Sequence, residues 1–290
     1  MMHRTAGEKI FNVINIVFMI LLIFITLYPL WYVLAASFSN PISVSRGIVT
    51  LWPDGFRLAS YKRVIETKNI WSSYGNTIFY AVVGTAVSMF LTVMGAYPLS
   101  KRNLPGRRFI MFVALFTMWF GAGMIPTFLN FRNLHLYDSR LGIILCFAVS
   151  TFYVILMRTF FENVPDSMEE SAKIDGANDW VILFRIYLPL SVPAIATLTM
   201  YYFVGRWNSY FWSMLLLQDQ TKIPLQVLLR RLIVEVSLTM TEYADVSANT
   251  MTEQTIIYAT IVVAVIPMLV LYPFIQKYFV KGIMIGAIKG

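Results

Sequence analysis

The chain has 290 residues, of which 58% are hydrophobic and 13% are charged, and its mean hydropathy is +0.67. Soluble domains are about 45–50% apolar and about 25% charged, so these proportions exclude an ordinary soluble protein and indicate a lipid bilayer as the solvent. The formal net charge of +8 does not indicate nucleic-acid binding, because the basic residues lie between apolar segments and form no dense basic face.

The first apolar segment, at about 11–38, follows Arg4 and Lys9 and partly resembles a secretory signal. It is longer than the roughly 7–15 apolar residues of a signal peptide. It is long enough to cross the hydrocarbon core of a bilayer. We therefore predict a retained first membrane helix.

Five further apolar segments have spanning length, so we predict an all-α integral membrane protein in which residues 1–290 form one transmembrane domain. Backbone groups in lipid must be satisfied internally, which favours helices, and the segments lack the alternation of barrel strands. Gly121, Gly123 and Pro126 predict a kink in the third span. The six predicted spans lie at about 11–38, 75–99, 109–129, 141–161, 188–216 and 255–276.

The loop 101–108 sets the predicted orientation. It carries four basic residues and no acid, and the positive-inside rule places it in the cytoplasm. The loop 39–74 is also basic, but it is long, and the rule is weaker for long loops. With six spans, both termini are then cytoplasmic, the loops at about 39–74 and 217–254 face outward, and the loop at about 162–187 faces inward.

The inward loop predicts two short helices. Ser167 and Glu170 have the spacing of a capping box, Gly176 supplies a left-handed C-terminal position, and Asn178 is a cap for the second helix. One interpretation is a capped helix pair that only connects two spans. The other is a docking site, in which small residues admit a partner backbone and carboxylates offer charge to its basic groups.

The spacing of this loop resembles the EAA loop of binding-protein-dependent ABC importer permeases. That pattern is E-A-A, three residues, G, nine residues, I, one residue and L-P. Here it reads Glu170-Ser171-Ala172, Gly176, Ile186 and Leu188-Pro189, with Ser171 in place of the first alanine. The resemblance implies that the loop docks in a cleft of a separate ATPase subunit and moves with it. The expected coupling residues are Glu169, Glu170, Ser171, Ala172, Asp175, Gly176, Ala177, Trp180 and Pro189.

Three other segments resemble the carbohydrate branch of this family, the maltose-importer type: 188–193, Trp207-Asn208 and 281–290. This resemblance implies the smaller permease of a pair, with the type I ABC importer fold, in the bacterial plasma (inner) membrane. In that branch a similar tail, here 277–290 with Gly286 and Lys289, reaches between two ATPase subunits. A frayed terminus is the alternative. The loop at 217–254, with an amphipathic stretch at 225–233, would meet the substrate-binding protein.

The sequence contains no G-x-x-x-x-G-K-[ST] phosphate loop, so the chain is expected to hold no cofactor and to be no enzyme by itself. Mg-ATP would be bound by the partner ATPase. His3, His135 and Cys146 offer no metal cluster or catalytic pair. The resemblance implies as partners a second homologous permease, two ATP-binding subunits, a periplasmic or surface-anchored substrate-binding protein, an oligosaccharide and membrane lipid.

Candidates for the substrate path are Tyr201, Arg206, Trp207, Asn208 and Tyr210 in the fifth span. Aromatic rings there would stack on sugar faces, or anchor the helix at the membrane interface. At ~1.5 Å per residue, Arg206 lies roughly 27 Å along a straight helix from Leu188, near the outer edge. We therefore predict that Arg206 snorkels to the surface. The alternative is that it pairs with an acidic sugar such as a uronate.

The function that these features predict is alternating-access import of an oligosaccharide, with an acidic uronate fragment as one candidate. One alternative is an ABC permease for a non-sugar solute. Another is a stand-alone secondary transporter, which would need intramembrane carboxylates or repeats with broken helices. The predicted spans contain almost no Asp or Glu, which counts against the secondary transporter.

Overall fold

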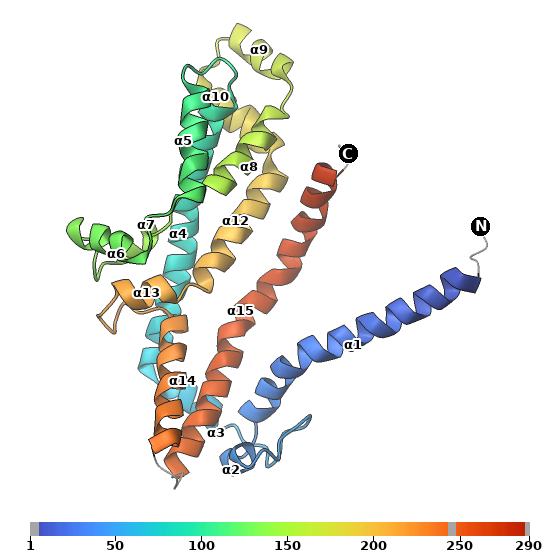
Figure 1. The fold of residues 1–290 in the computed structure, drawn as a ribbon, viewed down its shortest axis with the longest axis vertical. Helices are drawn as coiled ribbons and strands as arrows, with labels where there is room; N and C mark the ends of the chain where they lie inside the picture. The colour runs from blue at the N-terminus through green and yellow to red at the C-terminus, as the bar shows by residue number, and fades with distance from the viewer. Residues whose placement is uncertain (1–5, 243–247, 288–290) are drawn as a thin grey trace. The chain divides into compact units, whose positions relative to one another are not determined.

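The computed structural model describes residues 6–242 and 248–287, and within these ranges it is helical and contains no β-strand (Figure 1). The predicted all-α class is therefore confirmed. The chain divides into two compact units, Met1–Ile70 with Leu229–Ile266, and Trp71–Leu228 with Pro267–Gly290. Each unit is described by itself below.

The first unit holds α1 (Ala6–Ser37), α2 (Pro41–Ser45), α3 (Ala59–Glu66) and parts of α14 (Leu225–Glu242) and α15 (Ala248–Ala287). The Ser60 hydroxyl donates to Thr255 Oγ1 over 3.0 Å, which ties α3 to α15. The ring of Tyr32 on α1 meets Tyr258 on α15 edge-on, with centroids 6.0 Å apart. The predicted outer loops at 39–74 and 217–254 are thus largely helical.

The second unit carries both regions that the sequence singles out. Its long helices α4, α5, α8 and α12 run side by side in Figure 1, and Met157, Phe161, Ile182 and Leu198 are almost fully buried among them. The elements are α4 (Lys68–Ser100), α5 (Arg107–Trp119), α6 (Met124–Asn133), α7 (Arg140–Leu145), α8 (Thr151–Glu162), α9 (Asp166–Ile174), α10 (Asp179–Ile182), the π-helical turn η1 (Leu183–Tyr187), α11 (Leu188–Leu190), α12 (Val192–Trp207) and α13 (Phe211–Leu216).

Three of the predicted spans are broken. The chain bends by 115° between α5 and α6, where Gly123 adopts a φ of +84°, so the kink predicted there is confirmed but is a full break. The predicted span at 141–161 is interrupted between α7 and α8, where Phe147 has a φ of +51°. The chain bends by 83° between Leu190 and Val192, next to Pro193, which has no N–H for a helical bond.

Three described helices are long and apolar enough to cross a membrane: Gly7–Ser37, Lys68–Ser100 and Glu253–Val270. The number rises to five if each of the two bent pairs counts as one span. The sixth predicted span and the cytoplasmic termini stay predictions. The predicted tail from residue 277 is helical as far as Ala287, because α15 continues to that residue and includes Gly286; its contact with the ATPase subunits stays a prediction. Lys289 lies outside the described residues.

Candidate functional site: an inward loop and a membrane cavity

The turn between α9 and α10 has the geometry that the sequence predicts. Gly176 adopts a φ of +79°, its N–H bonds to the Lys173 carbonyl at 3.0 Å, and the Ala177 N–H bonds to the Ala172 carbonyl at 2.9 Å. This pair of bonds is a Schellman motif, which satisfies the last carbonyls of a helix. The Asn178 side chain accepts from the Val181 N–H at 2.9 Å and caps α10, as predicted.

The capping box predicted for Ser167 and Glu170 is wrong. Helix α9 begins after Pro165, and no side chain caps it. The φ of −60° at Pro165 fixes the direction in which the chain enters α9, so the helix starts two residues earlier than a Ser167 cap would allow. Glu170 is left exposed instead of folding back onto the helix end.

Most residues of the inward loop are exposed at the surface of the second unit. Exposed residues include Glu170, Ser171, Asp175, Gly176, Trp180 and Pro189, whereas Ala172 and Ala177 are half-buried against the core. Ile174 is 87% exposed, and Trp180 stacks on Phe184 with both rings more than half exposed. Apolar residues in so exposed a position indicate a contact surface.

Glu169 differs from its neighbours because it turns inward. Its carboxylate accepts from Lys101 Nζ at 2.5 Å, from Lys173 Nζ at 2.7 Å and from the Tyr187 hydroxyl at 2.5 Å. Lys101 also lies 4.3 Å and 4.0 Å from the ring centroids of Tyr97 and Tyr187, within the range of cation–π attraction. We call Tyr97, Lys101, Glu169 and Tyr187 the inner latch. The inner latch joins the end of α4 to α9 and η1; contact of Glu169 with a partner stays a prediction.

The inner latch predicts a specific pH dependence. Burial acts to raise the pKa of Glu169, but hydrogen bonds from Lys101, Lys173 and Tyr187 outweigh burial and lower the pKa from 4.5 to about 2. Because the pKa is depressed in the fold, the carboxylate stabilises the protein above pH 4.5, and this contribution is lost as the pH falls from 4.5 to about 2. Differential scanning fluorimetry is expected to show a steeper loss of stability in this interval for the wild-type chain than for Glu169→Gln. Parallel curves for the two proteins would contradict the assignment.

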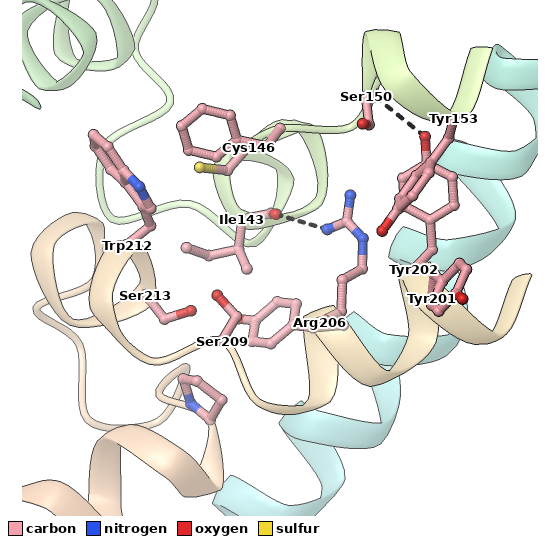
Figure 2. A pocket seen from close by; sticks show the side chains of 14 residues that line it. Ile143, Cys146, Ser150, Tyr153, Tyr201, Tyr202, Arg206, Ser209, Trp212 and Ser213 are labelled. Atoms are coloured by element: carbon pink, nitrogen blue, oxygen red, sulfur yellow. Dashed lines mark hydrogen bonds between the residues drawn. The ribbon is translucent and has the colours of Figure 1, made fainter. Parts of the chain in front are cut away.

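A cavity of about 320 Å³ lies where the α7–α8 break meets α12 and α13 (Figure 2). This volume falls at the lower end of the range for small-molecule sites. Among the 14 residues that line it within the described part of the chain, Arg206 is the only charged one. The aromatic residues of its wall are Tyr80, Phe147, Tyr153, Tyr201, Tyr202 and Trp212.

Arg206 does not snorkel to the surface, so that prediction is wrong. Its Nη1 donates to the Ile143 carbonyl at 3.1 Å, and its Nη2 donates to the Ser88 hydroxyl and the Ile144 carbonyl, each at 2.9 Å. Figure 2 shows the side chain pointing into the cavity, between Ile143 and Tyr202. The inward direction depends on Gly84 of α4, where an added Cβ would lie 2.6 Å from Nη1.

The other predicted path residues divide between the cavity and the surrounding structure. Tyr201 lines the cavity with Arg206. Trp207 is 2% exposed and packs edge-on against Tyr74, with centroids 6.0 Å apart. Asn208 caps α12 by donating to the Val204 carbonyl at 3.0 Å, and neither Asn208 nor Tyr210 lines the cavity. Sequence reasoning missed Ser150, Tyr153 and Tyr202, which no local pattern marks.

This arrangement of a broken-helix membrane unit with an exposed inward loop is that of a known class of transport protein. Residues 93–285 match the family described as binding-protein-dependent transport system inner membrane component. The chain belongs to this family, whose members are the membrane permeases of ABC importers, so the resemblance seen in the EAA spacing and the inner-membrane location are confirmed. These are components of transport systems and not enzymes.

Two relatives and one solved structure are similar to the chain over nearly its whole length. The chain is 44% identical to the polygalacturonan/rhamnogalacturonan transport system permease protein YtcP of Bacillus subtilis, over 98% of this chain and 99% of the relative. It is 41% identical to Protein LplC of the same organism, over 100% of this chain and 98% of the relative. It also matches a chain of a solved bacterial ABC transporter involved in the import of the acidic polysaccharide alginate, with a TM-score of 0.88 and 42% identity, covering 96% of this chain and 100% of that chain.

Proposed function

We propose that this permease forms half of the pathway of an ATP-driven importer for an acidic oligosaccharide. The observation that carries the proposal is the exposed EAA loop on a chain without a phosphate loop of its own, since such a loop requires an ATPase partner. The acidic cargo is inferred from the names of relatives that share more than two fifths of their residues with this chain. A permease for a neutral sugar is the competing function, and uptake of acidic and neutral oligosaccharides distinguishes the two.

The proposed complex contains a second homologous permease, two ATPase subunits that bind Mg-ATP, and a periplasmic or surface-anchored binding protein. The chain crosses the inner membrane six times with both termini in the cytoplasm. The exposed residues of the loop, Glu170, Ser171, Asp175, Gly176 and Trp180, contact the ATPase, while Ala172 and Ala177 allow its close approach and Pro189 sets the direction of the following span. Gly286 and Lys289 in the C-terminal segment contact the ATPase pair.

Coupling in this proposal is a difference in affinity. The ATPase subunits must bind the loop differently in the inward-open and outward-open states of the permease, because only a differential affinity shifts such an equilibrium. Closure of the ATPase pair on Mg-ATP then moves the two inward loops together and opens the pathway to the binding protein. Hydrolysis and release reverse the change.

The Schellman turn at Gly176 gives the first test of this coupling. A β-branched residue at a φ of +79° is strained, although a Cβ there would meet nothing within 4 Å. Gly176→Val is therefore expected to lower substrate-stimulated ATPase activity at least fivefold, and Gly176→Asn to lower it less, because Asn tolerates the left-handed region. Equal activity of the wild type and Gly176→Val in the reconstituted importer would contradict the docking role.

Uptake into proteoliposomes tests the function as a whole. The permease is purified with its co-expressed neighbours and reconstituted with Mg-ATP enclosed in the lumen, at the ATPase face, and the binding protein is added outside with the ligand. We expect accumulation of tri-galacturonate that depends on ATP and on the binding protein. A purified particle without ATPase subunits would contradict the importer assignment, and uptake of neutral oligosaccharides alone would contradict the acidic cargo.

A further inference from the structure

The partly buried guanidinium of Arg206 has no counter-ion among the residues that the structure describes. Within residues 6–242 and 248–287, none of the ion pairs closer than 4.0 Å involves Arg206. Its three hydrogen bonds go to two carbonyls and one hydroxyl, all neutral. A charge removed from water is costly unless an opposite charge is supplied, so the cavity is electrostatically suited to an anion.

The guanidinium also keeps unused hydrogen-bonding capacity. An arginine side chain has five N–H donors, and three are used in the bonds described above. The Nε atom is buried and has no hydrogen-bond partner in the described structure, and one N–H of Nη1 remains. The bonds to Ile143 and Ile144 hold the guanidinium at the last turn of α7, which leaves the second Nη1 donor for a ligand in the cavity.

The α7–α8 break adds a second favourable element. Helix α8 begins at Thr151, and its N-terminus opens at the cavity through Ser150, whose N–H donates to the Tyr202 hydroxyl at 3.2 Å. The N-terminus of a helix carries a partial positive charge that favours anions. Figure 2 shows Ser150 and Arg206 facing the same space from two different elements.

The remaining walls suit a sugar ring. Tyr153 and Tyr201 are nearly parallel, with ring centroids 5.9 Å apart and planes 10° apart, and Trp212 packs against Phe147 on the other side. Aromatic faces offer an apolar surface with a polar rim, which matches the C–H face and hydroxyl edge of a sugar. Ser209 and Ser213 add hydroxyl groups to the lining.

We infer that this cavity is a subsite of the translocation pathway for one uronate residue, with Arg206 binding its carboxylate against the N-terminus of α8. The inference rests on the proposed function and assigns the specificity for acidic cargo to a residue of the permease, in addition to any selection by the binding protein. It explains why a charged side chain lies inside an otherwise uncharged span region. Removal of the Arg206 charge is then expected to lower the transport of acidic sugars more than the transport of neutral sugars.

The test compares two forms of one ligand. Tri-galacturonate and its methyl ester differ in charge but have the same sugar chain. In the full reconstituted importer, Arg206→Gln is expected to lower the rate of tri-galacturonate uptake about tenfold relative to wild type, the size of one charge-assisted hydrogen bond, and to change methyl-ester uptake less than twofold. Each variant is compared with wild type on the same loaded binding protein, so discrimination by that protein cancels.

Equal losses for the two ligands would overturn the inference, because they would show that Arg206 only holds α7 in place. Unchanged uptake of both would overturn it as well. If wild type does not import tri-galacturonate, the proposed function fails instead, so the two failures are distinguishable. Arg206→Lys, which keeps the charge but not the fork geometry, is expected to retain more tri-galacturonate uptake than Arg206→Gln.

A second measurement needs no variant at position 206. Cys146 is the single cysteine of the chain and lines the cavity. In an importer whose other subunits lack cysteine, tri-galacturonate is expected to slow labelling of Cys146 by a small thiol reagent at least threefold, and the methyl ester is expected to protect it less. Equal protection, or none from either ligand, would overturn the inference even if Arg206→Gln fails to assemble.

Discussion

Replacing Gly84 by alanine is expected to lower tri-galacturonate uptake at least tenfold, although the substitution adds one methyl group. The new Cβ would lie 2.6 Å from Nη1 and 2.7 Å from both Cδ and Cζ of Arg206, so the entire end of the arginine side chain must move. Overpacking of this kind costs about 1–3 kcal/mol. The displaced guanidinium would lose its bonds to Ile143 and Ile144, and the measurement is uptake by the reconstituted importer together with its unfolding temperature.

The same helix provides the matched control. A Cβ at Gly95 of α4 would lie 3.6 Å from Val154 Cγ1, an ordinary van der Waals contact. Gly95→Ala is therefore expected to keep normal uptake and to gain about 0.5–1 kcal/mol of stability from helix propensity. Adding Arg206→Gln to Gly84→Ala should recover part of the lost stability, because the shorter side chain removes the clash. Identical behaviour of the two alanine variants would contradict the close approach of Gly84 and Arg206.

Glu169→Ala is expected to be the most damaging substitution in the inward loop. It removes the acceptor of three hydrogen bonds and leaves Lys101, whose side chain is 22% exposed, without its carboxylate. Removing one partner of a part-buried ion pair costs about 2–3 kcal/mol. The permease pair without its ATPase should unfold at a temperature several degrees lower, and the assembled importer should hydrolyse ATP without responding to the loaded binding protein.

Glu170→Ala tests whether the exposed docking surface contributes to ATPase binding independently of the inner latch. Glu170 is adjacent in sequence but exposed, so its loss should leave the unfolding temperature of the permease pair unchanged. Its effect should appear as weaker binding of the ATPase subunits, measured by co-purification at increasing salt. A fall in unfolding temperature of the same size for both variants would show that Glu169 has no special structural role.

The short-range features of the inward loop were predictable because they depend on neighbouring residues. Gly176 lies where the backbone needs a positive φ, and Asn178 lies where a helix needs an acceptor, so the pattern and the structure agree. The capping box failed because Pro165 already determines where α9 starts. The inward turn of Glu169 depends on Lys101, 68 residues earlier, and no local spacing contains that information.

The position of Arg206 shows a second limit of prediction from the sequence. The prediction of snorkelling treats the fifth span as one straight helix and measures distance along it, but the chain bends by 83° before Val192. The prediction also considers only the length of the arginine, whereas the space it occupies is made by a glycine on α4, 122 positions earlier in the sequence. Composition and periodicity predict the apolar segments, but the cavity lies where the α7–α8 break meets α12 and α13.

Helix α4 is unbroken while the neighbouring spans are not, and this gives it a distinct mechanical role. Gly84 and Ser88 lie against Arg206, and Tyr97 near the other end belongs to the inner latch. About 20 Å of continuous helix, at ~1.5 Å per residue, separates Gly84 from Tyr97 within α4. Because a continuous helix transmits a tilt along its length, a small tilt at the end near Tyr97 is expected to change how tightly the other end holds the guanidinium.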